Sequence, residues 1–125
     1  MPVWNLNAAW IGILVGFLTG AAQGLFFHDE AWLGGYASWP RRMMRLGHIS
    51  CFGLAFINLA FVVTTDHLRT GTGLFWPSLL FIAGAFSMPI VCYLSAWRKP
   101  ARHLFFVPVL SLIVGAMLFV KRLMS

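Results

Sequence analysis

Residues 74–122 read LFWPSLLFIAGAFSMPIVCYLSAWRKPARHLFFVPVLSLIVGAMLFVKR. Two apolar runs, residues 74–97 and residues 101–121, lie on either side of the turn Arg98-Lys99-Pro100. A helix needs about 20 mainly apolar residues to cross the hydrocarbon core of a bilayer, and each run has that length. Because the connecting turn is so short, the two runs predict neighbouring antiparallel transmembrane helices.

Two further apolar runs precede this stretch, at residues 8–28 and residues 44–65. A polar and aromatic loop, residues 28–43, separates them, and the short segment 66–73 leads to the third run. The predicted fold class is therefore all-α integral membrane: a four-helix antiparallel transmembrane bundle that forms one domain over residues 1–125.

Two prolines, Pro89 and Pro108, lie inside the third and fourth apolar runs. Proline removes a hydrogen bond of the helix interior and clashes with the preceding turn. Membrane helices tolerate this where neighbouring groups satisfy the freed backbone. We therefore expect a kink in each of these two helices.

The composition agrees with a membrane protein and argues against nucleic-acid binding. Of the 125 residues, 60% are hydrophobic and only 10% are charged, which is too few charges for a soluble domain of this length. The net charge of +6 would suggest a nucleic-acid partner in a soluble protein. Here the basic residues lie between apolar runs, where they indicate topology and contact lipid headgroups.

The distribution of these basic residues predicts an orientation. With four spans, both termini lie on one side of the membrane, together with three cations, Arg69, Lys121 and Arg122. The other side carries six, namely Arg41, Arg42, Arg45, Arg98, Lys99 and Arg102. Since cytoplasmic loops carry the excess of Lys and Arg, we expect a multi-pass protein of an inner membrane with both termini outside.

The first apolar run contains a glycine stripe, Gly12, Gly16, Gly20 and Gly24. Residues four apart are displaced by about 40° around a helix, so the stripe forms one slowly drifting groove. Small residues let another helix approach closely, which predicts packing against a helix of this chain, a second copy or a partner subunit. A flat, rigid cofactor lying in the groove is the alternative.

Three histidines, His28, His48 and His103, are expected at the same cytoplasmic boundary, whereas His67 lies on the opposite side. Ionisable residues at membrane depth are costly, so they are candidates for function. The alternative is that they lie at headgroup level with the neighbouring Trp and Arg residues.

A b-type haem needs two axial ligands, and His48 with His103 is the best pair, with His28 in reserve. Both lie about one turn inside their predicted helices, above apolar faces. Arg45 and Arg102 are the nearby candidates for binding the haem propionates. A quinone is the alternative cofactor, because it requires little more than a polar donor beside an apolar groove.

Other polar residues within the spans have plainer interpretations. Cys51 and Cys92 lie at comparable depth and with His48 would make a thiolate–imidazole metal site, although buried cysteines are common apolar fillers. Asn58 and Gln23 are expected to hydrogen-bond across helices and fix their register.

No span carries Asp, Glu, Lys or Arg at mid-depth, which argues against a proton pump or a channel with a charged filter. No catalytic arrangement of residues appears, so we expect no intrinsic enzymatic activity. The leading hypothesis is a small accessory subunit of a membrane redox or energy-transducing complex that binds haem b or a quinone. The alternative is a structural or assembly protein without a cofactor that packs against partner helices, followed by an oligomeric transporter or channel.

Overall fold

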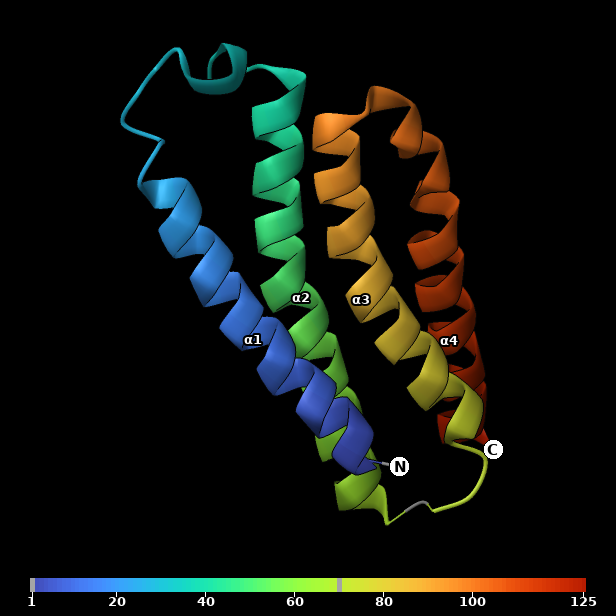
Figure 1. Cartoon of the computed structure of the whole chain (residues 1–125). Helices are drawn as coiled ribbons and strands as arrows, with labels where there is room; N and C mark the ends of the chain where they lie inside the picture. The colour runs from blue at the N-terminus through green and yellow to red at the C-terminus, as the bar shows by residue number, and fades with distance from the viewer. Residues whose placement is uncertain (1, 70) are drawn as a thin grey trace.

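The computed structural model describes residues 2–69 and 71–125, so Met1 and Thr70, which fall in the predicted domain, lie outside the described part. The elements are α1 (Pro2–Gly24), η1 (Trp32–Gly34), α2 (Trp39–Leu68), α3 (Phe75–Trp97), η2 (Lys99–Phe105) and α4 (Phe106–Met124). The four α-helices run antiparallel, with both chain ends at one end of the bundle (Figure 1). We call this the terminus end, and the opposite end, with its loop 25–38 and turn 98–105, the basic end.

All four helices are long and apolar enough to cross a membrane, with η2 leading directly into α4. The prediction of a four-helix antiparallel transmembrane bundle is thereby confirmed.

The helix bounds differ from the predicted spans mainly in α1 and α2. Helix α1 begins before residue 8, and the buried Asn5 belongs to it. The helix ends at Gly24, four residues earlier than predicted. Helix α2 begins at Trp39, where Ser38 caps it by accepting a hydrogen bond from Arg41 N at 3.4 Å. Its 30 residues have a length of about 45 Å, more than the hydrocarbon thickness of about 30 Å, so its basic start extends beyond the apolar layer.

The predicted kink at Pro108 is wrong. Pro108 is the third residue of α4, directly after the 3-10 segment η2, whereas Pro89 does lie inside α3. The first four N–H groups of an α-helix have no partner within the helix, so a proline at this position removes no hydrogen bond.

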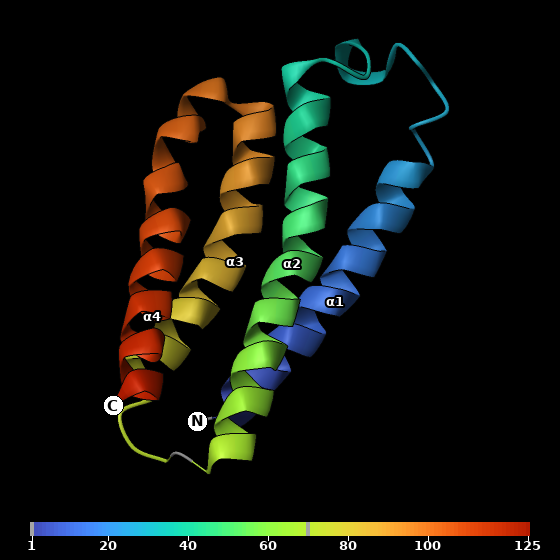
Figure 2. The same cartoon turned by 180° about the vertical axis from the view of Figure 1, so that it is seen from behind.

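The helices pack in chain order, with α2 and α3 in the middle (Figures 1 and 2). Helix α1 lies against α2 and also reaches α3, while α4 lies against α3. Two glycines make the α3–α4 contact close. Gly84 receives the side chain of Leu112, and Gly115 receives Leu80.

An aromatic cluster fills the terminus end. Phe61 of α2 and Phe81 of α3 are buried beside Leu74, and Phe119 of α4 packs against them. The ring centroids of Phe61 and Phe119 are 4.9 Å apart in an edge-to-face arrangement, which is favourable for aromatic pairs. Through this ring, α4 contacts α2 as well as α3.

A group of three buried polar side chains, which we call the asparagine clamp, joins α1, α2 and α3. Asn5 Nδ2 donates to Asn58 Oδ1 at 2.7 Å, and the Ser78 hydroxyl donates to Asn5 Oδ1. Asn58 Nδ2 donates to Leu54 O at 2.9 Å, and both asparagines are 0% exposed. The predicted cross-helix hydrogen bond of Asn58 is confirmed, and in an apolar layer such bonds hold helices in register.

Candidate ligand site between the first three helices

The spacing between α1 and α2 widens along the glycine stripe. A methyl group at Gly12 would lie 3.2 Å from the backbone oxygen of Cys51, so the two helices nearly touch there. At Gly16 the Phe52 ring fills the space, and at Gly20 the His48 ring does so. Gly24 has no such neighbour within 4 Å. Two rings of α2 therefore separate the helices toward the basic end.

His48 contacts α1 through Thr19. Its Nδ1 lies 3.4 Å from Thr19 Oγ1, and the Thr19 hydroxyl donates to Val15 O at 2.8 Å and Gly16 O at 3.2 Å. Because the Thr19 hydroxyl donates within its own helix, Thr19 Oγ1 is available to accept a hydrogen bond from His48 Nδ1–H. The imidazole in that tautomer keeps Nε2 free as an acceptor.

Tyr93 of α3 packs against the start of the same stretch of α2. A methyl group at Gly47 would lie 3.0 Å from the Tyr93 ring, so the ring of α3 packs against the residue that precedes His48. Gln23, which is almost completely buried, donates from Nε2 to the Tyr93 hydroxyl oxygen. The cross-helix bond predicted for Gln23 is confirmed, and the Tyr93 hydroxyl has the Thr19 side chain as a second hydrogen-bonding neighbour.

We call these four side chains, Thr19, Gln23, His48 and Tyr93, the polar cluster. They come from α1, α2 and α3 and lie on the basic-end side of the membrane span. Several of their hydrogen-bonding groups, among them His48 Nε2 and the second N–H and carbonyl oxygen of Gln23, have no partner among the described residues. Spare hydrogen-bonding capacity of this kind is costly in a membrane unless a ligand uses it.

An apolar cleft begins one turn below the polar cluster. It has a volume of about 120 Å³ and opens between α1 and α3, over a floor formed by α2. Its lining residues are Ala8, Ile11, Gly12, Val15, Cys51, Ala55, Ala85, Phe86, Pro89 and Ile90. Val15 is four residues before Thr19 and Ile90 three before Tyr93, so one helical turn joins the cleft to the polar cluster on both walls.

The structure does not bring His48 and His103 together. The His48 ring packs against Gly20 of α1, whereas exposed His103 lies on η2, which packs against α3. Helix α3 lies between α2 and the chain that carries His103 (Figure 1). His28, the reserve ligand, is exposed in the turn after α1.

The two arginines predicted to bind propionates are also apart from the polar cluster. The Arg45 guanidinium stacks on the Tyr36 ring at 3.9 Å and donates to Tyr36 O at 2.9 Å. Arg102 is exposed on η2. Both arginines lie at the rim of the basic end.

The cysteines are buried and unpaired, and Cys51 contributes to the floor of the cleft. Cys92 packs near Gly47, where an added methyl group would lie 3.1 Å from its Cβ. Within residues 2–69 and 71–125, no three His, Cys, Asp or Glu side chains are grouped so that they could hold a metal ion. The geometry therefore gives no support to the predicted thiolate–imidazole site.

Sequence reasoning missed Thr19 and Tyr93, which complete the polar cluster. Thr19 directly precedes Gly20 of the glycine stripe, and Tyr93 is the one tyrosine within an apolar run. Each was detectable as a polar group in a span. However, nothing in the apolar pattern indicated that Thr19 would face His48 or that Tyr93 would meet Gln23.

Arg41 was predicted as a headgroup anchor, but it is buried, with 4% of its surface exposed. Its Nη1 donates to Asp29 O at 3.3 Å and to Glu30 O at 3.4 Å. The guanidinium also lies over the rings of Phe27, at 5.1 Å, and Trp32, at 5.8 Å. Arg41 therefore holds the loop 25–38 across the basic end.

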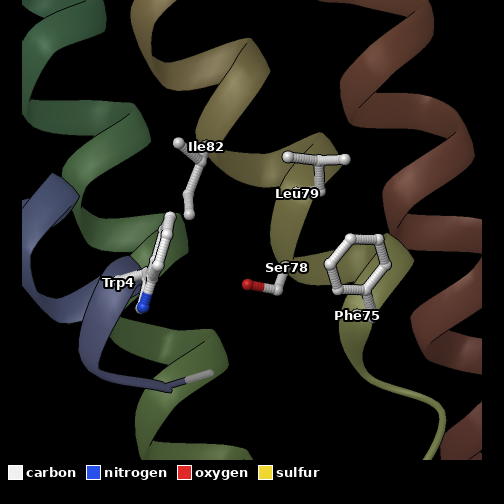
Figure 3. A pocket seen from close by; sticks show the side chains of 5 residues that line it. All are labelled: Trp4, Phe75, Ser78, Leu79 and Ile82. Atoms are coloured by element: carbon white, nitrogen blue, oxygen red, sulfur yellow. The ribbon is translucent and has the colours of Figure 1, made fainter.

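A second recess lies at the terminus end, between the starts of α1 and α3 (Figure 3). Its volume is about 80 Å³, and its lining is Trp4, Phe75, Ser78, Leu79 and Ile82. The Ser78 hydroxyl is already committed to Asn5 in the clamp. The wall of this recess is apolar, and it makes a poor site for a polar ligand.

Comparison with known proteins adds no assignment to this geometry. No protein-family model, curated protein or solved structure matches the chain. The function must therefore be argued from the polar cluster, the apolar cleft and the surfaces around them.

Proposed function

We propose that the chain is a small accessory subunit of a membrane redox complex and that it binds a quinone between α1, α2 and α3. One observation carries the proposal: the polar cluster, with its spare donor and acceptor, lies one turn from the apolar cleft. A quinone likewise has a polar part, a ring bearing oxygen atoms, and an apolar part, a long tail.

The hydrogen-bonding chemistry suits both redox forms of such a ligand. A quinone carbonyl accepts hydrogen bonds, and the Tyr93 O–H would turn from Thr19 to donate one while the Tyr93 oxygen accepts from Gln23. A quinol hydroxyl donates, and His48 Nε2 is the acceptor left by the bond between Nδ1 and Thr19. The isoprenoid tail would run along the cleft over Gly12 and Ala55.

Haem b has less support than a quinone. Axial ligation by His48 and His103 would require His48 to leave its contact with Gly20 and Thr19, and η2 to move around α3. His28 is exposed in the turn after α1, so it does not replace either histidine as an axial ligand beside the polar cluster.

The test is a titration of the purified protein, reconstituted in nanodiscs, with a short-tailed quinone, read by quenching of tryptophan fluorescence. Saturable binding that weakens up to about tenfold in Tyr93→Phe is expected, because one hydrogen bond contributes about 0.5–1.5 kcal/mol. His48→Gln should weaken binding similarly. Tyr36→Phe is the matched control, since Tyr36 lies in the exposed loop at the rim.

Two outcomes would contradict the proposal. One is wild-type protein that shows no saturable quinone binding although it is folded. The other is an absorption spectrum with a bis-histidine Soret band that is lost in His48→Ala and in His103→Ala, which would favour haem instead.

The second candidate function, a structural or assembly protein, rests on α4. This helix packs on one side only, and most of its large apolar side chains are exposed. The glycine stripe is no longer available for partner helices at Gly12, Gly16 and Gly20, because α2 occupies it. A partner would therefore bind α4, so Val114→Trp should abolish copurification of that partner while quinone binding remains.

A further inference from the structure

The basic end has a seam between α2 and η2, built around Trp39. The indole Nε1 of Trp39 donates to Ser95 O at 2.8 Å, which fixes the ring of α2 against the end of α3. The Arg42 guanidinium lies 5.8 Å from the centre of this ring and the Lys99 ammonium 5.3 Å from it. Two cations from different elements thus lie near one aromatic ring that is hydrogen-bonded to α3.

These two cations have no acidic partner. No ion pair is formed within residues 2–69 and 71–125, and the acidic residues of the basic end are Asp29 and Glu30. The Asp29 carboxylate accepts a hydrogen bond from Ala31 N instead. The ring face of Trp39 offsets part of the repulsion between Arg42 and Lys99. An anion between them would offset the rest.

The other cations of the rim do not compete for this role. Arg41 is buried under the loop, and Arg45 is stacked on Tyr36 and bonded to its carbonyl. Arg42 and Lys99, in contrast, are exposed and donate to no acceptor among the described residues. They are therefore free to bind an external anion.

The position of the seam near headgroup level indicates which kind of anion it would bind. The start of α2 extends beyond the apolar layer, and Trp97, which ends α3, is 85% exposed. Exposed tryptophans of membrane proteins gather at headgroup level. Arg42, Leu46 and Ile49 follow one another at helical spacing, so a cation lies above exposed apolar side chains on one face of α2.

We propose that this seam binds an anionic phospholipid, with its phosphate between Arg42 and Lys99 and an acyl chain along Leu46 and Ile49. A guanidinium binds two phosphate oxygens at once, and the ammonium binds as a point charge. The apolar face below favours a lipid over free phosphate, which would use the two cations alone.

Native mass spectrometry of the purified protein, titrated with phosphatidylglycerol or with phosphatidylcholine, tests this site. We expect tight binding of one phosphatidylglycerol and weak binding of phosphatidylcholine. Each cation near a lipid surface contributes about 1 kcal/mol, so Arg42→Gln or Lys99→Gln should weaken retention about fivefold and the double variant more than tenfold. Trp39→Phe, which removes the bond to Ser95, should give an intermediate loss.

Lys121→Gln is the matched control, because it removes the same charge from an exposed site at the terminus end. An equal loss in this variant would mean diffuse charge attraction and would overturn the proposal. Equal retention of the two lipids would overturn it as well. Displacement of phosphatidylglycerol by millimolar inorganic phosphate would show a simple anion site without lipid recognition. Quinone binding by Arg42→Gln should be unchanged, which separates this site from the polar cluster.

Discussion

The two ends of the α1–α2 pair handle buried polar groups in opposite ways. At the terminus end, Asn5 and Asn58 use their amides on each other, on Ser78 and on backbone carbonyls. At the basic end, Gln23 and His48 each keep hydrogen-bonding groups without a partner among the described residues. The comparison teaches that a closed polar network serves the fold, whereas an open one in the same helices is where a ligand would bind.

The largest loss of stability is expected from a substitution at the tightly packed end of the glycine stripe. Gly12→Leu should destabilise the protein by about 3 kcal/mol or more, because the side chain would meet the backbone of Cys51 and part α1 from α2. Gly24→Leu should change stability by less than about 0.5 kcal/mol, since nothing lies near it. Unfolding in mixed micelles by added SDS measures both. Equal losses would mean that the helices do not diverge as described.

The asparagine clamp should come next. Asn58→Ala removes the acceptor of the Asn5 amide and leaves a cavity in a fully buried site, which should cost about 2–3 kcal/mol. The same micelle assay applies, with Asn7→Ala on the exposed side of α1 as the matched control. A neutral Asn58→Ala would show that the clamp contributes nothing to stability.

The smallest of the three effects concerns the open network. Thr19→Val is nearly isosteric and deprives His48 Nδ1 of its acceptor, so stability should fall by about 1 kcal/mol or less. The proposed quinone affinity should fall a few-fold, because the imidazole is no longer held in one tautomer. Thr64→Val, in the part of α2 near the terminus end and only partly buried, is the control. A Thr19→Val protein with unchanged affinity would remove Thr19 from the site.

Hydropathy and charge spacing were sufficient to predict the four helices, and Asn58 and Gln23 could be recognised as cross-helix amides. The position of His48 within an apolar helix was also predictable, although α2 begins five residues earlier than expected, but the direction of its side chain was not. A membrane helix is apolar on its lipid side and on its protein side, so the sequence pattern does not indicate which neighbour a residue faces. For that reason His48 was paired with His103 across the bundle, while its ring packs against Gly20.

Arg41 escaped prediction for a related reason. Its neighbours Arg42 and Arg45 lie at the rim as expected, and nothing local separates the three. Burial of Arg41 depends on the carbonyls of Asp29 and Glu30 and on the rings of Phe27 and Trp32. These partners meet only after the loop has folded back over the helix ends. The position of Pro108 could not be predicted locally either. Pro108 lies in the first turn of α4 because the preceding residues form the 3-10 helix η2.

The loop that Arg41 holds has a consequence for how a ligand arrives. It spans the gap between α1 and α2 on the aqueous side, whereas the cleft opens sideways between α1 and α3. A hydrophobic molecule would enter by lateral diffusion within the bilayer instead of descending from the water. Occupancy would then follow the mole fraction of that molecule in the lipid, so the protein would sample the composition of its own membrane.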